Sequence, residues 1–179
     1  MKSYLMYFSI LAVILIIISL IGGFVIVLAS FLVLFEKCLF GRIAIIQGIE
    51  FTTISTILVV LAYGPAIGVL FCICISMILP AIINNMIGEK WVANKDFSVF
   101  SIGFGNVVDI LCVFIIHFLR GFDIFWIMVV MLLFKHISGN IIGKFKETNF
   151  IVDYLGLIIS VLFNLGAVFF FHSFWLSLL

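Results

Sequence analysis

Long apolar runs, separated by short polar stretches, follow one another along the whole chain. An α-helix needs about 20 residues to cross the hydrocarbon core of a bilayer. Six runs are suitable, and they cover residues 4–35, 43–62, 65–87, 97–119, 121–142 and 150–175. The longest polar stretches, residues 88–97 and 143–149, are only loop-sized. The pattern predicts an all-α integral membrane protein, with one polytopic domain of about six transmembrane helices over residues 1–179.

Two of these runs contain residues that interrupt helices. The run over residues 4–35 is long enough to cross at a steep tilt or to break near Gly22 and Gly23, so six and seven spans both remain open. Pro80 lies inside the third run. Because proline has no backbone N–H, we expect it to kink this helix or end it early.

The composition supports a membrane location. Hydrophobic residues make up 66% of the chain and charged residues only 9%, with a mean hydropathy of +1.50. Soluble domains carry about 25% charged residues, and a soluble chain this apolar would expose large sticky patches. The net charge of +1 gives no excess that would attract nucleic acid. We therefore expect a multi-pass protein of the cell membrane, with the lipid bilayer as its surroundings and no nucleic-acid partner.

The positive charges predict an orientation, because loops rich in Lys and Arg stay in the cytoplasm. With six spans, two of the nine basic residues, Lys2 and Arg120, lie on one side. If the first run is a pair of helices broken at Gly22 and Gly23, Lys2 joins the other side, although residues 24–35 are short for a span. The six-span count puts both termini outside and seven basic residues inside: Lys37, Arg42, Lys90, Lys95, Lys135, Lys144 and Lys146.

Ionisable residues inside a membrane are costly and tend to be functional. Asp109 lies near the middle of the fourth run, and Asn106 lies one turn before it on the same helix face. A carboxylate and an amide on one face are able to bind a cation, a proton or a polar ligand. The alternative is an interhelical clamp, and Lys135 and His136 in the fifth run are plausible partners for it.

A second polar group begins at Glu50, where four hydroxyl side chains follow in an otherwise apolar run: Thr52, Thr53, Ser55 and Thr56. These side chains either line a polar cavity or bond back to carbonyls of their own helix. We slightly favour the second interpretation for Thr53 and Thr56. Asn164 in the sixth run is an isolated amide, which in lipid needs a partner on another helix.

Enzyme signatures are absent from the sequence. It contains no Gly-rich phosphate loop, no H-E-x-x-H and no G-x-S-x-G. The four cysteines lie in or beside apolar runs, where cysteine behaves as a small hydrophobic residue, and Cys72-Ile73-Cys74 is not a zinc-binding spacing. We therefore predict that the chain is not an enzyme and has no catalytic residue, metal site or cofactor.

Part of the chain resembles a known family. The segments IEFTTIS at 49–55 and YGPAIGV at 63–69 resemble the second and third helices of S components of energy-coupling-factor vitamin transporters, with the riboflavin type closest. The segment GFGN at 103–106 resembles the start of that family's fourth helix. The rod-shape proteins of the MreD type share the same architecture. Elsewhere the likeness rests only on the number of spans.

The resemblance implies a six-helix bundle that binds a vitamin-sized ligand and docks on a transmembrane coupling subunit with ATPases. In that family the N-terminus is cytoplasmic, opposite to the charge count, and the first run lacks the family's Ala-x-x-x-Ala docking pattern. Two functions follow as expectations: a solute-binding transporter subunit, or a non-catalytic MreD-like scaffold that organises other membrane proteins. Residues carried over to the ligand site are Glu50, Thr52, Thr53, Asn106 and Asp109.

Overall fold

The computed structural model describes residues 9, 12–13, 16, 23–38, 50–86, 104–146 and 154–179. All regular elements in these residues are helices, so the all-α class is confirmed for this part of the chain. The elements are α2 (Phe24–Cys38), α3 (Thr52–Tyr63), α4 (Pro65–Phe71), the π-helical segment η2 (Cys72–Ile78), α5 (Leu79–Met86), α6 (Phe104–Phe118), α7 (Ile124–Lys146), α8 (Tyr154–Phe170) and α9 (His172–Ser177).

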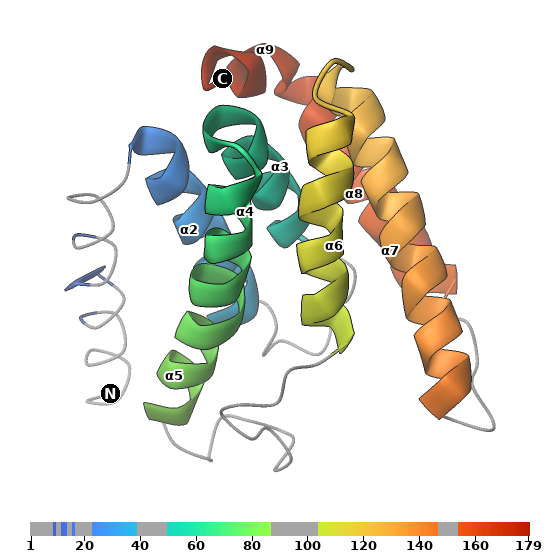
Figure 1. Cartoon of the computed structure of the whole chain (residues 1–179), viewed down its shortest axis with the longest axis horizontal. Helices are drawn as coiled ribbons and strands as arrows, with labels where there is room; N and C mark the ends of the chain where they lie inside the picture. The colour runs from blue at the N-terminus through green and yellow to red at the C-terminus, as the bar shows by residue number, and fades with distance from the viewer. Residues whose placement is uncertain are drawn as a thin grey trace.

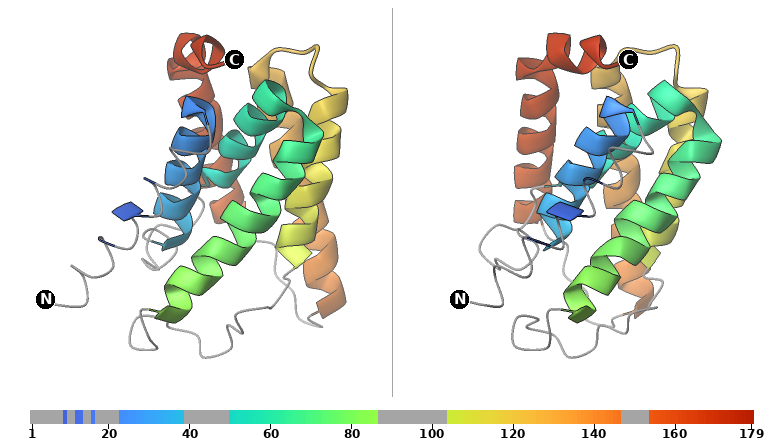
Figure 2. Two further views of the ribbon diagram at one scale, coloured as in Figure 1. Left: turned by 60° about the vertical axis from the view of Figure 1, so that its left-hand side comes forward. Right: turned by 90° about the vertical axis from the view of Figure 1, so that its left-hand side faces the viewer.

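The helices form a bundle in which successive segments run in alternating directions (Figure 1). The two turned views in Figure 2 show the same antiparallel arrangement, with α9 lying across one end. Gly64 makes the sharp turn between α3 and α4 with a φ of 84°, a conformation that favours glycine. Pro65 follows at the first helical position, where its missing N–H has no partner to lose.

The centre of the bundle is α3. It packs against α2, α4, α6 and α7, and every residue from Thr52 to Val60 is buried. The apolar core lies between α3, α6 and α7. Its fully buried members include Ile57, Leu58, Val113, Ile116, Ile127, Met128 and Met131.

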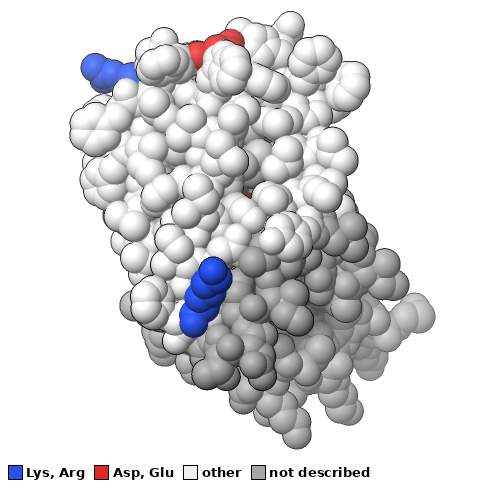
Figure 3. Space-filling model, turned by 90° about the vertical axis from the view of Figure 1, so that its right-hand side faces the viewer, with Lys and Arg blue, Asp and Glu red and all other residues white. Residues whose placement is uncertain are grey.

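The outside of the bundle is as apolar as its core. Phe118, Phe145 and Phe170 are each at least 80% exposed. On the face drawn in Figure 3, charged side chains lie at the top and one basic side chain lies lower down, and the described surface between them is almost entirely uncharged. The buried residues, by contrast, include many polar ones: Ser30, Thr52, Thr53, Ser55, Thr56, Ser76, Asp109 and Asn164. This distribution suits a protein whose outer surface meets lipid.

Two helices are long and apolar enough to cross a membrane by length and composition, Pro65–Ile83 and Ile124–Phe145. Three further apolar helices in the described residues are shorter, at Thr52–Tyr63, Gly105–Phe118 and Gly156–Phe170. Parts of the expected second and fourth spans, residues 43–49 and 97–103, lie outside the described residues. The helices are thus compatible with membrane association, and the number of spans stays a prediction.

The first and sixth apolar runs are each divided. Gly23 is not helical, and α2 begins at Phe24 and continues past the expected end at residue 35 to Cys38. In the last run, Phe171 leaves the helical conformation with φ −109° and ψ 21°, so α8 ends at Phe170. The non-helical Gly23 agrees with the break near Gly22 and Gly23 that the sequence left open, whereas the expected single helix over 150–175 is not continuous.

The third run does not end early at Pro80, because α4, η2 and α5 form one continuous helical segment to Met86. In an α-helix, the N–H of residue 80 would donate to the carbonyl of Ser76. Pro80 has no N–H, and Lys37 Nζ donates to this carbonyl instead, at 2.8 Å. The π-helical turn before Pro80 widens the helix where a proline ring would otherwise meet the preceding turn.

The short helix α9 is fixed to the bundle by two polar contacts. Trp175 Nε1 donates to the carbonyl of Ala167 at 3.0 Å, and His172 Nε2 lies 2.9 Å from Asp123 Oδ2 in the turn between α6 and α7. Asp123 also caps the start of α7, because its Oδ1 accepts a hydrogen bond from the backbone N–H of Phe125 at 2.8 Å. This N–H, and then His172, lower the pKa of the Asp123 carboxyl.

Gly68 marks the closest approach of α4 to α3 and α6. A Cβ at this position would come within 2.5 Å of Val60 Cγ2 and 3.0 Å of Val113 Cγ1. We expect Gly68→Ala to lower the free energy of unfolding in detergent by about 1–3 kcal/mol, because these stiff, buried side chains have no room to move.

The control is Gly166→Ala in α8, where an added Cβ meets nothing within 4 Å. This change is expected to stabilise by up to about 1 kcal/mol through helix propensity. A Gly68→Ala protein as stable as wild type would show that the helices do not pack this closely.

Candidate functional site

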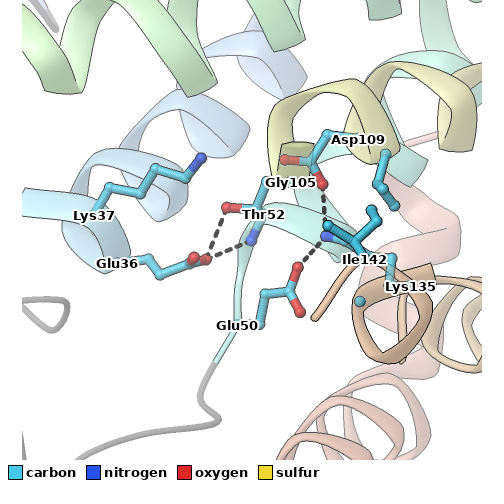
Figure 4. Close-up of a pocket in the computed structure, with 10 residues that line it drawn as sticks. Glu36, Lys37, Glu50, Thr52, Gly105, Asp109, Lys135 and Ile142 are labelled. Carbon is cyan, nitrogen blue, oxygen red and sulfur yellow. Dashed lines mark hydrogen bonds and ion pairs between the residues drawn. The ribbon is translucent and has the colours of Figure 1, made fainter. Parts of the chain in front are cut away.

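A cavity of about 310 Å³ lies between α2, α3, α6 and α7 and is partly open to the surface. Figure 4 shows its charged side chains converging from these elements. The cavity lies beside the first turns of α3 and α6 and the middle and C-terminal half of α7. Its lining residues are Glu36, Lys37, Glu50, Thr52, Gly105, Val108, Asp109, Lys135, Gly139 and Ile142.

Lys135 of α7 is at the centre of the charged group. Its ammonium Nζ forms an ion pair with Glu50, lies 2.7 Å from Asp109 Oδ1 and donates to Thr53 Oγ1 at 3.0 Å. The Thr53 hydroxyl in turn donates to Glu50 Oε1 at 2.8 Å. An ammonium group has three N–H donors, and all three are used here. One side chain thereby connects α7 to α6 and to the start of α3.

Glu36 of α2 binds the start of α3. Its Oε2 accepts the backbone N–H groups of Phe51 and Thr52, the latter at 2.6 Å, and the Thr52 hydroxyl at 2.9 Å. The first N–H groups of a helix have no partner within the helix, and the helix dipole there favours negative charge. Glu36, on the neighbouring helix α2, supplies both the hydrogen-bond acceptor and the negative charge at the start of α3.

Lys37, the next residue, binds the π-helical segment. Its Nζ donates at 2.8 Å to both the carbonyl and the hydroxyl oxygen of Ser76. Among the described residues, no carboxylate forms an ion pair with Lys37. The adjacent residues Glu36 and Lys37 therefore point to different helices, and together they join α2 to α3 and η2.

Among the described residues that line the cavity, the five charged side chains do not balance. Three are carboxylates, Glu36, Glu50 and Asp109, and two are ammonium groups, Lys37 and Lys135. One negative charge remains in excess when all five are ionised. Asp109 is the most enclosed member of the Lys135 ion pairs, with 10% of its side chain exposed. Charges this enclosed are stable only when they are paired and hydrogen-bonded.

The structure brings together most of the residues that the sequence singled out. Glu50, Thr52 and Asp109 line the cavity, and Thr53 lies behind Glu50 in contact with Lys135. Asn106 is half-buried one turn before Asp109 and does not line the cavity. Ligand binding by this set stays a prediction.

Two expected polar partners lie elsewhere. His136 points to Asn140 of its own helix, with Nε2 2.8 Å from Asn140 Nδ2, rather than to Asp109. Asn164 donates to the Ser160 carbonyl at 2.8 Å, one turn earlier in α8, and so meets its need for a partner within its own helix. Neither residue lines the cavity.

The two threonines for which we favoured bonds to their own helix behave differently. Thr56 does bond back, since its hydroxyl donates to the carbonyl of Thr52 at 2.8 Å. Thr53 does not, and this expectation was wrong, because its hydroxyl donates to Glu50 Oε1 and accepts a hydrogen bond from Lys135 of α7. Which of two similar hydroxyls meets another helix depends on packing rather than on local sequence.

Sequence reasoning missed Glu36, Lys37 and Ser76. The two charged residues directly follow the first apolar run and were assigned to its end and the adjoining loop, but α2 continues through both of them. The available signal was an acidic and a basic residue side by side, close to a long apolar helix. Ionisable residues at membrane depth usually have specific partners.

No family model, curated protein or solved structure matches the chain. The function is therefore inferred from the site itself.

Glu36 can be tested separately from the Lys135 cluster. Glu36→Ala leaves two backbone N–H groups and a hydroxyl without their acceptor, and we expect it to lower the free energy of unfolding by about 1–3 kcal/mol. Glu36→Gln keeps an acceptor oxygen and should lose clearly less. Unfolding of the purified proteins in detergent measures both, and equal losses for the two variants would contradict this role of Glu36 at the start of α3.

Proposed function

We propose that the chain is a multi-pass protein of the cell membrane, with about six spans, and that its charged cavity binds a small polar solute. In this function the chain is the solute-binding subunit of a transporter. The observation that carries the proposal is the cavity itself, a space of about 310 Å³ lined by five ionisable side chains within an apolar bundle. Ligand pockets in proteins are about 300–1,000 Å³.

The distribution of side chains supports the membrane part of the proposal. Charged groups lie inside the bundle, while large apolar side chains such as Phe118 and Phe145 face outward. In water, burying the charged groups and exposing the large apolar side chains are both unfavourable. In lipid the outer surface is in its preferred solvent, and the charges are sheltered with their partners.

The orientation that we propose follows from a corrected charge count. Lys37 and Lys135 bind within the bundle and are not loop charges. Of the remaining seven basic residues, Lys2, Arg42, Lys90 and Lys95 lie outside the described residues, and Lys144 is exposed near the end of α7. The count for six spans is then five to two, with the same side in the cytoplasm. The residues that line the cavity come from the end of α2, the starts of α3 and α6 and the C-terminal half of α7, so the cavity lies nearer the end of the bundle at which α2 and α7 finish.

The resemblance to S components supports this proposal only at the positions that it assigned to the ligand site. Three carried-over positions, Glu50, Thr52 and Asp109, line the cavity. The proposed orientation differs from that family's, since it puts the cavity nearer the cytoplasmic end. We therefore propose solute binding and leave vitamin uptake and docking on a coupling subunit as what the resemblance implies.

One observation favours the alternative, a scaffold of the MreD-like kind. Every N–H of Lys135 already has a partner, Glu50, Thr53 or Asp109, as a clamp between helices requires. In this function the charges hold the helices in place, and the outer surface binds other membrane proteins. The two functions differ in whether the cavity has an occupant.

Filling the cavity without breaking an ion pair separates the two functions. Gly139 lines the cavity, and an added Cβ there meets nothing within 4 Å. Gly139→Leu should place its side chain in the solute's space and unfold like wild type. Gly166→Leu is the matched control, because Gly166 has equally open surroundings in α8 and lies outside the cavity lining.

The three purified proteins are incubated with the small-molecule fraction of a cell extract, washed, and denatured, and the released compounds are identified by mass spectrometry. Solute binding predicts that wild type and Gly166→Leu retain at least one compound that Gly139→Leu does not. Identical sets of retained compounds from all three proteins would refute solute binding and favour the scaffold.

A further inference from the structure

The donors in the cavity are almost fully used. Lys135 donates all three of its N–H groups to Glu50, Thr53 and Asp109. Lys37 directs two hydrogen bonds to Ser76. Of the six ammonium N–H groups that face the cavity, one is left without a partner among the described residues. An incoming anion would find few donors there.

The carboxylate oxygens in the cavity, in contrast, are only partly used as hydrogen-bond acceptors. Each carboxylate has one oxygen that is engaged: Oε2 of Glu36, Oε1 of Glu50 and Oδ1 of Asp109. The second oxygen of each accepts no hydrogen bond from the residues that the structure describes, and all three side chains line the cavity. Figure 4 shows the dashed contacts ending on one oxygen of each carboxylate.

We infer that the solute is a small organic amine that binds as a singly charged cation. The inference rests on the proposed solute-binding function and names the class of solute. Its ammonium group would donate to the unused carboxylate oxygens and cancel the excess negative charge. Hydrogen bonds in which donor and acceptor are ionised are stronger than those between neutral groups.

The size and lining of the cavity favour an organic cation over a bare ion. At about 30 Å³ for each water-sized group, the cavity of about 310 Å³ holds roughly ten such groups. Val108 and Ile142 give it apolar walls that suit methylene groups. Among the described residues, no group of three or more His, Cys, Asp and Glu side chains is placed to hold a metal ion.

The test uses four probes at equal concentration and ionic strength: n-butylammonium chloride, 1-butanol, sodium butyrate and sodium chloride. The melting temperature of the full chain in detergent is measured for wild type, Gly139→Leu and Gly166→Leu. A ligand that binds only the folded protein raises its stability in a saturable way. We expect n-butylammonium alone to do so, for wild type and Gly166→Leu but not for Gly139→Leu.

A charge variant makes the test sharper. Glu36→Gln removes the excess negative charge without touching the ion pairs of Lys135, and it keeps an acceptor for the start of α3. We expect it to weaken n-butylammonium binding by about tenfold, the effect of losing one hydrogen bond to a charged group. Unchanged binding in Glu36→Gln would contradict the role given to the excess charge.

Several outcomes overturn the inference without overturning solute binding. If butyrate or 1-butanol stabilises wild type but not Gly139→Leu, the cavity binds a solute of another class. If sodium chloride reproduces the effect of n-butylammonium, the site prefers an inorganic cation. If no probe raises the melting temperature of wild type, the solute is not an organic amine. The compounds retained from the cell extract then show separately whether the cavity binds any solute.

Discussion

The bundle depends on one ammonium group. Lys135 projects from the middle of α7 toward the carboxylates of Asp109 in α6 and of Glu50, two residues before α3. None of these charges is tolerable alone in an apolar interior. Because the cluster is complete only when three segments meet in one register, it specifies how these helices pack. Core residues such as Ile57, Val113 and Met131 are apolar and fill space, and many apolar packings would accommodate them equally well.

A second group of contacts continues this arrangement through α2. Glu36 provides the acceptor that the start of α3 lacks, and Lys37 binds the carbonyl and hydroxyl oxygens of Ser76, four residues before Pro80. Glu36 and Lys37 thus each bind polar groups of a neighbouring segment. The cavity lies beside Gly105 and Gly139, which have no side chains to fill it.

The sequence predicts the helical class well, since an apolar chain in lipid has to satisfy its backbone internally. It also points to Asp109 and Glu50, because charges in apolar runs are conspicuous. It does not predict their partners: Lys135 reaches them while its neighbour His136 turns to Asn140, a choice made by the rotation of α7. The ends of helices are equally hard to predict, because Phe171 interrupts the last run without a glycine or proline, and α2 continues through two charged residues.

The central claim is that Lys135 and Asp109 stabilise the bundle as a pair. A double-mutant cycle of Lys135→Met and Asp109→Asn, read as free energies of unfolding in detergent, measures this directly. Lys135→Met leaves the carboxylates of Asp109 and Glu50 without their ammonium partner and is expected to cost about 3–5 kcal/mol. Asp109→Asn keeps the ion pair between Lys135 and Glu50, so it should cost less. The double variant should cost less than the sum of the two by at least about 1 kcal/mol. If the two costs simply add, the charges do not interact in the folded protein, and the bundle is held together in some other way.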